Sequence, residues 1–136
     1  MTVQLVGTDR LFAGAPYAYA ATVAGGTLVF TAGACPLDTD GTVVAPGDAA
    51  GQTRQALDNL ILALAACRAT VRDVVKTTVY VASSDRGDLV AAWREVAAAF
   101  HDHPAPSTLL GVAALGYPGQ LVEIEAVAVT NQPPDR

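Results

Sequence analysis

Apolar and polar positions alternate most regularly near the C-terminus, in the stretch LVEIEAVAV at residues 121–129. Because strand side chains alternate between two faces, the apolar residues at even positions are predicted to share one face, and Glu123 and Glu125 the other. A carboxylate beside apolar strands is costly to desolvate unless it is exposed, paired or protonated. The two acids therefore lie either at an edge or wet interface, or one of them lines a cleft as a general acid/base.

Further strands are predicted by short apolar or β-branched runs at residues 17–24, 26–34, 74–82 and 107–115. The first two are separated by Gly25-Gly26, which is typical of a tight hairpin turn. Residues 11–37 lack any charge, but glycines and prolines interrupt them. A hairpin therefore explains this segment better than a membrane-spanning helix.

Two segments show the three- and four-residue spacing of amphipathic helices. The first follows Asp48, a predicted N-cap, and its polar positions include Gln52. Its predicted apolar stripe is Leu57, Leu60, Ile61, Leu64 and Ala65. The second follows SSDRGD and ends at HDHPAP, since proline cannot continue a helix. Its predicted apolar stripe is Leu89, Trp93, Val96, Ala97 and Phe100.

The order of the predicted elements, ββαβαββ, indicates a single α+β domain over residues 1–136, with two helices packed on one face of a sheet. The other sheet face then needs cover. Only 15% of the residues are charged and 51% are hydrophobic, so an oligomer is expected to supply that cover. The net charge of −5 and the lack of a basic run argue against nucleic acid as a partner.

The remaining chemistry-bearing side chains have simpler interpretations. His101 and His103 form an H-x-H pair, but no other ligand completes a metal site, so both are predicted to face solvent at a helix end. Cys35 and Cys67 are predicted to be free thiols, and Cys35 to be a small packing residue rather than a nucleophile. Tyr17, like Trp93, is a packing residue on this reading. The N-terminal residues lack the pattern of a signal peptide, which predicts a cytoplasmic protein with no membrane association.

A family resemblance extends from about Tyr17 to Val129. It rests on six stretches that occur in family order and spacing: APYAYA, LVFTAGACPLD, QTRQALDNLILALAACRATVRDVVKTTVYVA, AAWREVAAAF, PAPSTLLGVAAL and LVEIEAVAV. The chain resembles the Rid family, the YjgF-like reactive intermediate deaminases, also labelled L-PSP endoribonucleases. The resemblance implies a chorismate-mutase-like homotrimer with a central barrel and ligand clefts between subunits. No metal or cofactor is expected. It also implies hydrolysis of enamines and imines to keto acids and ammonia.

Carried over position by position, the resemblance implies catalytic roles for Glu123, which positions water, and for Tyr17 near the cleft mouth. It implies a ligand-binding turn at Thr31, Ala32 and Gly33. The family arginine that clamps a substrate carboxylate falls on Ser107 when aligned from GVAAL, or on Pro106 when aligned from the preceding proline. Trp93 takes the place of a small polar helix residue near the cleft.

Because serine cannot reproduce the two hydrogen bonds of an arginine fork, hydrolysis of the usual 2-imino acids is not expected. The first hypothesis is a trimer that binds a small uncharged or differently charged metabolite in its clefts, with hydrolytic or proton-transfer chemistry. In it Glu123 is the acid/base, Ser107 and Tyr17 orient the ligand, and Trp93 reshapes the pocket. The alternatives are a non-catalytic binding or sensing trimer and, from the older family label, an endoribonuclease.

Overall fold

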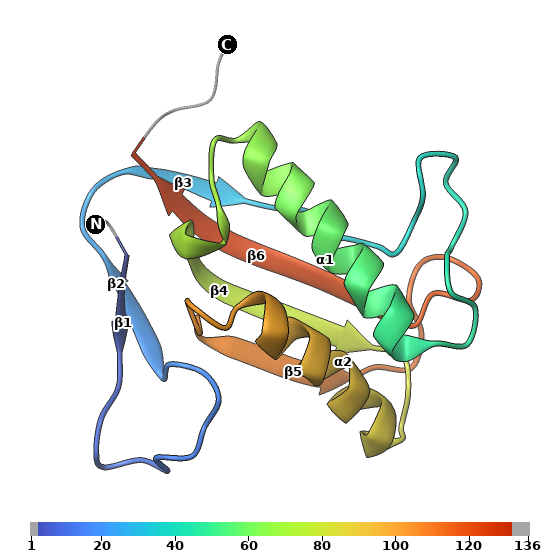
Figure 1. The fold of residues 1–136 in the computed structure, drawn as a ribbon, viewed down its shortest axis with the longest axis horizontal. Helices are drawn as coiled ribbons and strands as arrows, with labels where there is room; N and C mark the ends of the chain where they lie inside the picture. The colour runs from blue at the N-terminus through green and yellow to red at the C-terminus, as the bar shows by residue number, and fades with distance from the viewer. Residues whose placement is uncertain (1–2, 132–136) are drawn as a thin grey trace.

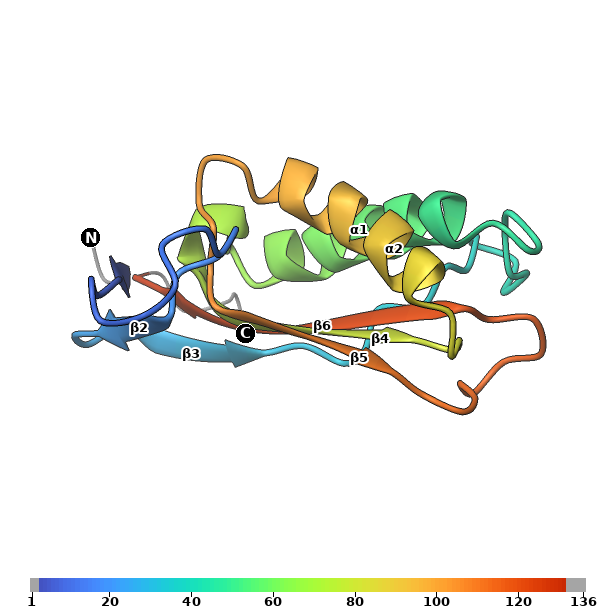
Figure 2. The ribbon, with the colours of Figure 1, turned by 90° about the horizontal axis from the view of Figure 1, so that it is seen from below.

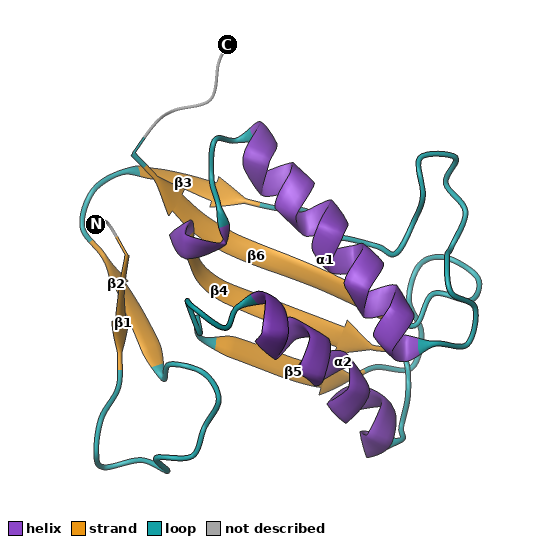
Figure 3. Cartoon of the chain, viewed as in Figure 1, coloured by secondary structure: helices purple, strands orange, loops and turns teal. Residues whose placement is uncertain are grey.

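Two helices lie side by side on one face of a four-stranded sheet in the computed structural model, which describes residues 3–131 (Figures 1 and 2). The strand order is β3-β6-β4-β5. These strands are β3 (Thr27–Phe30), β4 (Val74–Val81), β5 (Ser107–Gly111) and β6 (Val122–Thr130). β6 pairs antiparallel with β3 and β4, while β5 runs parallel to β4, so the sheet is mixed. The predicted α+β class and the placement of the helices are confirmed (Figure 3).

Both helices begin at aspartate caps. The carboxylate of Asp48 accepts a hydrogen bond from Gly51 N at 3.0 Å, as predicted, at the start of α1 (Ala49–Ala66). The carboxylate of Asp85 accepts one from Gly87 N at 2.8 Å at the start of α2 (Arg86–Ala99). Each cap satisfies a backbone donor that the first helical turn leaves without an intrahelical partner. A short 3-10 helix, η1 (Val71–Asp73), leads from α1 towards β4.

The buried face of α1 is rotated about the helix axis, by about one residue position, relative to the predicted apolar stripe. Leu57, Leu60 and Leu64 are buried as expected, but Ile61 is 41% exposed and Gln52 is fully buried. The reason is that the Gln52 amide finds backbone partners in a neighbouring loop, which removes the cost of burying it.

The alternation predicted for β6 is confirmed. Its even-numbered residues Val122 to Ala128 are buried against the helices, whereas Glu123 and Glu125 lie on the opposite face and are half-buried. That face carries exposed apolar side chains as well: Leu28 is 58% and Phe30 72% exposed. The expectation that the second sheet face lacks cover within one chain therefore holds.

The predicted hairpin between residues 17–24 and 26–34 is wrong. β2 (Ala20–Val23) pairs instead with β1 (Val3–Val6) in a separate two-stranded sheet, and β3 pairs with β6. Gly25 and Gly26 both have positive φ, which permits a tight turn without requiring the flanking strands to pair. The strands that pair with β2 and β3 are β1 and β6, and a glycine turn signal carries no information about which strands will pair.

β5 is shorter than predicted: it ends at Gly111, whereas the apolar run predicts a strand up to residue 115. At Gly111 the backbone passes so close to Ser83 that a Cβ would stand 2.7 Å from the Ser83 carbonyl oxygen. After this close approach the chain leaves the sheet in a loop that returns at β6. None of the helices within residues 3–131 is both long and apolar enough to cross a membrane.

Candidate functional site

Glu123 is held by two donors on one of its carboxylate oxygens. Its Oε1 accepts hydrogen bonds from Cys35 Sγ and from Gln120 Nε2, each at 3.2 Å. Its Oε2 lies so close to Gly33 that a Cβ at that position would collide with it. Within residues 3–131 no side chain or backbone group donates to Oε2. We define Glu123, Gln120, Cys35 and the turn Thr31–Gly33 as the carboxylate site.

The turn Thr31–Gly33 is fastened to β6 at both ends. Thr31 N donates to the Ala126 carbonyl at 3.0 Å, and Thr31 Oγ1 accepts from Ala126 N at 2.9 Å. Ala34 N then donates to the Ile124 carbonyl at 2.7 Å. Because more residues separate these two attachments on the turn than on β6, the turn bulges outward, and its glycine lies beside the Glu123 carboxylate.

Cys35 is a protonated hydrogen-bond donor rather than a nucleophile. Burial, the hydrogen bond to Glu123 and the negative charge of that carboxylate raise the pKa of the Cys35 thiol to about 11. Since the thiolate is the reactive form, this cysteine is unreactive near neutral pH. The prediction that Cys35 is not a nucleophile is thus supported, although its thiol makes a specific polar contact and does more than fill space.

Glu125, the second acid of β6, has a structural partner. It lies across from Thr78 on β4, and its Oε1 accepts a hydrogen bond from the Tyr80 phenol at 2.7 Å. That bond raises the pKa of Tyr80, because ionising the phenol would remove the donor and place two negative charges together. Glu125 therefore ties β6 to β4, while Glu123 has one oxygen, Oε2, to which no group of residues 3–131 donates.

Tyr17, Trp93 and Ser107 gather at a second location, which we call the aromatic pocket. The rings of Tyr17 and Trp93 meet edge to face, with centroids 6.0 Å apart. The segment that carries Tyr17 is held by a hydrogen bond from Ala18 N to the Pro104 carbonyl at 2.8 Å. The adjoining cavities of this pocket have volumes of about 200 and 460 Å³. Their lining includes Pro16, Tyr17, Thr77, Trp93, Val96, Phe100, Ser107 and Leu109.

The carboxylate site and the aromatic pocket lie on opposite sides of the sheet. Ser107 pairs with Thr77, whose hydroxyl donates to Ser107 Oγ at 2.7 Å and whose side chain is buried beneath the helices. Glu123 pairs with Tyr80, which points to the uncovered face. One chain therefore brings Tyr17, Trp93 and Ser107 together, and separately brings the turn Thr31–Gly33 to Glu123.

No arginine reaches Glu123 within the described chain. Arg10 is exposed in the loop after β1, and Arg94 is exposed on α2, on the helix side of the sheet. Lys76 of β4 lies on the uncovered face, where its Nζ donates to Thr108 Oγ1 at 2.6 Å. It pairs with Val127, four residues along β6 from Glu123, or roughly 13 Å at the rise of a strand.

The two histidines differ from each other. His101 is exposed beside Asp102, as predicted, but the prediction for His103 is wrong. His103 is buried, and its Nε2 lies 2.7 Å from the Val74 carbonyl, so it fastens the end of α2 to the start of β4. Among residues 3–131 no group of three or more His, Cys, Asp or Glu side chains is arranged to hold a metal ion.

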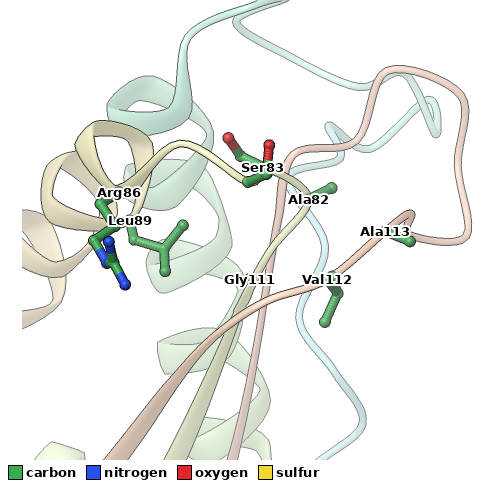
Figure 4. A pocket seen from close by; sticks show the side chains of 8 residues that line it. Ala82, Ser83, Arg86, Leu89, Gly111, Val112 and Ala113 are labelled. Carbon is green, nitrogen blue, oxygen red and sulfur yellow. The ribbon is translucent and has the colours of Figure 1, made fainter.

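An open groove of about 640 Å³ lies at the C-terminal ends of β4 and β5, beside the start of α2 (Figure 4). It is lined by Ala82, Ser83, Ser84, Arg86, Leu89, Gly111, Val112 and Ala113. Arg86 is its charged residue, and the Ser83 hydroxyl is already engaged by Asp88 at 2.7 Å. None of the described residues that line the groove is an acid or a histidine, so we place the proton-transfer chemistry at the carboxylate site.

Sequence reasoning missed the amides that organise the carboxylate site. Gln120 is 4% exposed and contacts Glu123 directly. The spacing of the first helix predicts Gln52 and Asn59 on its polar face, away from the buried stripe. The available signal was weak: Gln52 lies four residues before Ala56 and eight before Leu60, so it falls on the buried stripe once the stripe is placed correctly.

Comparisons with known proteins agree with this architecture. The family profile described as Endoribonuclease L-PSP matches residues 8–130. The 2-iminobutanoate/2-iminopropanoate deaminase of Escherichia coli K12 is 36% identical over 107 residues, which cover 76% of this chain and 80% of that protein. A RutC family protein of Pyrococcus horikoshii is 33% identical over 110 residues, covering 81% and 85% of the two chains.

Solved structures of members of this family have the same fold as this chain. The Rid family protein YyfB of Yersinia pestis, described as of unknown function, superposes with a TM-score of 0.87 at 30% identity, over 96% of this chain and all of its own. Escherichia coli TdcF, solved with bound serine, superposes with a TM-score of 0.66 at 30% identity, over 93% of this chain and 98% of its own. The family profile, the relatives and the shared fold show that the chain belongs to the Rid family, also known as the YjgF or L-PSP family.

Proposed function

We propose that this protein is a homotrimer that binds a small, uncharged imine or enamine in clefts between subunits and hydrolyses its C–N bond. One observation carries the proposal. Glu123 is fixed by two donors on Oε1, yet its Oε2 has no donor within the described chain and lies on the uncovered sheet face. A carboxylate held in this way is suited to take a proton from water. The deaminase named among the relatives supports the reaction class.

The balanced reaction adds one water to one C=N group. The water oxygen bonds to the imine carbon as the C=N π pair moves to nitrogen, and one water proton passes through Glu123 Oε2 to that nitrogen, which gives the carbinolamine. The carbinolamine hydroxyl then gives up its proton, again through Oε2, to the nitrogen as the C–N bond breaks, so that ammonia leaves and a carbonyl compound remains. No cofactor or redox partner enters this sequence. An enamine reaches the same path after protonation at carbon gives its imine.

The placement of the two groups supports assembly into an oligomer, for which we propose a trimer. The carboxylate site and the aromatic pocket are on opposite sides of one sheet, so a single chain cannot present both to one small ligand. Exposed Leu28 and Phe30 give the uncovered face an apolar surface suited to other subunits. In the proposed cleft, Glu123 and the turn Thr31–Gly33 come from one subunit, and Tyr17, Trp93 and Ser107 from its neighbour.

An uncharged substrate is favoured by the lining of the aromatic pocket. Neither lysine nor arginine lines it among the described residues, its histidine, His101, lies beside Asp102, and its Ser107 hydroxyl is engaged by Thr77. A substrate carboxylate would therefore lose its hydration there without gaining the bidentate partner that an arginine provides. Aromatic rings and a few hydroxyl-bearing residues (Tyr17, Thr77, Ser107 and Thr108) instead suit a ligand that is mostly apolar with one polar end.

The test uses two imines generated in place. Oxidation of benzylamine by an amine oxidase gives a neutral aromatic imine, and oxidation of alanine by an amino-acid oxidase gives 2-iminopropionate. Disappearance of each imine is followed by semicarbazide trapping. The proposal expects faster loss of the neutral imine, abolished by Glu123→Gln. Acceleration of 2-iminopropionate alone would overturn the proposed substrate charge, because a cation would then have to reach the cleft.

A non-catalytic binding trimer is the second candidate, favoured by the same lack of lysine and arginine among the described residues of the aromatic pocket. It predicts that imines or related carbonyl compounds quench Trp93 fluorescence without being turned over. An endoribonuclease is disfavoured by the net charge of −5, since a phosphate-binding surface is normally basic. Salt-dependent RNA binding would be needed to revive it.

A further inference from the structure

Two amides on one face of α1 hold the two loops of the carboxylate site. The Gln52 amide donates to the Gly119 carbonyl at 3.0 Å and accepts from Leu121 N at 2.7 Å, so it fixes the backbone on both sides of Gln120. Two helical turns further on, Asn59 Nδ2 donates to the carbonyls of Cys35 and Leu37, at 2.8 and 2.9 Å. Hydrogen bonds from α1 therefore fix the backbone around both donors to Glu123, Gln120 and Cys35.

The orientation of the Gln120 amide is fixed by its own partners. Its Oε1 accepts from Tyr117 N at 3.1 Å, which identifies the other end of the amide as the donor. That donor, Nε2, reaches the Val122 carbonyl at 3.0 Å as well as Glu123 Oε1 at 3.2 Å. Because the side chain is 4% exposed, water does not compete strongly for these bonds.

The remaining ionisable groups near Glu123 do not bond to it. Tyr80, its cross-strand neighbour on β4, donates to Glu125 instead. Glu125 lies two residues along the same face of β6 and accepts from Tyr80; Cys35, from the loop after β3, is the ionisable group of the described chain that does bond to Glu123. The position of the Glu123 carboxylate therefore depends on Cys35 and Gln120.

We propose that Cys35 and Gln120 are positioning residues that occupy Oε1 of Glu123, so that Oε2, beside Gly33, is the oxygen that activates water. This inference rests on the proposed function. Both donors on one oxygen prevent the carboxylate from rotating, and they leave the second oxygen unbonded at the turn where a ligand would be held. The raised pKa of Cys35 agrees with this role, because a thiol that keeps its proton remains a donor at neutral and mildly alkaline pH.

The Cys35–Glu123 contact can be tested without any enzymatic turnover. In a Cys67→Ala background, the rate of Cys35 alkylation by iodoacetamide is measured against pH for wild type, Glu123→Gln and Glu125→Gln. Removing the Glu123 charge lowers the thiol pKa from about 11, so alkylation near neutral pH should rise roughly tenfold. Glu125→Gln is the matched control and should leave the rate unchanged. Equal rates in wild type and Glu123→Gln would overturn the contact.

The positioning role is tested by Cys35→Ser against Cys35→Ala, with neutral-imine hydrolysis as the readout. Serine keeps a donor and should retain activity within roughly twofold, whereas alanine should lower kcat about tenfold with little change in KM. Equal activity of wild type and Cys35→Ala, or a raised KM with unchanged kcat, would overturn the positioning role. A wild-type protein without turnover would contradict the proposed function, while the alkylation comparison would still decide the contact.

Discussion

The carboxylate site and the aromatic pocket are built by different means, although the family resemblance assigned them to one cleft. Hydrogen bonds define the carboxylate site: each of its groups is fastened to backbone or to a neighbouring side chain. Packing defines the aromatic pocket, where a ring contact between Tyr17 and Trp93 is supported by one hydroxyl pair. Chemistry that moves a proton needs the first kind of construction, and selection of an apolar ligand needs the second. Substitutions in the carboxylate site should therefore lower the rate of proton transfer, whereas substitutions in the aromatic pocket should weaken ligand binding.

The largest effect is expected from Glu123→Gln, which keeps the shape of the side chain but removes the base. We predict that kcat/KM for the neutral imine falls about a hundredfold or more, with the fold retained. Steady-state kinetics and circular dichroism together check this. Ser107→Ala is the comparison in the aromatic pocket and should cost only a few-fold, so equal losses in both variants would remove the distinction between the two regions.

Gln52→Leu should damage the carboxylate site through stability. The side chain is fully buried, and its removal leaves Leu121 N and the Gly119 carbonyl without their partner. Leaving such groups unsatisfied costs about 1–3 kcal/mol, to be measured as the free energy of unfolding in urea. Gln55→Leu, at a half-buried position on the same helix, is the control: it removes a side-chain hydrogen bond to Asn59 Oδ1 at 3.1 Å but takes no partner from a backbone group, so it should cost less.

Trp93→Ala should affect ligand affinity more than catalysis. Removing the ring enlarges the pocket beside Tyr17 and Ser107 and takes away apolar contact area. We expect KM for an aromatic imine to rise roughly tenfold, with kcat nearly unchanged. Loss of kcat at unchanged KM would instead place Trp93 within the proton-transfer machinery.

The smallest effect is expected from the Tyr80–Glu125 pair. The folded protein raises the pKa of Tyr80 above its ordinary value of 10.0, so the pair stabilises the fold while the phenol is protonated. Its contribution is complete below the unfolded pKa and is lost as the pH rises through the folded pKa. As the pH rises through that range, the free energy of unfolding should fall more for wild type than for Tyr80→Phe. Parallel pH profiles would contradict the assignment.

Much of the fold was predictable because it rests on local periodicity. The alternation around Ile124 placed Glu123 and Glu125 on one face, and the spacing of Leu57, Leu60 and Leu64 gave the first helix. The pairing of β2 was not predictable, because the Gly25-Gly26 signal concerns backbone dihedrals and says nothing of distant partners.

The candidate site was predictable only in part, for a related reason. Glu123 stood out because a charge in an apolar strand is unusual. Gln52, Asn59 and Gln120 are ordinary polar residues in the sequence, and their role comes from long-range contacts with backbone. Burial of Gln52 depends on a loop 67 residues away, which no local pattern indicates.

Mixed trimers test most directly the central claim that the two regions meet across a subunit boundary. Glu123→Gln and Trp93→Ala subunits are unfolded, mixed in equal amounts and refolded, and hydrolysis of the neutral imine is assayed below KM. In a randomly assembled trimer about a quarter of the clefts would combine an intact Glu123 with an intact Trp93 of its neighbour. We predict recovery of about a quarter of wild-type activity, well above either parent. Activity equal to the mean of the two parents would contradict the account, because the site would then lie within one subunit.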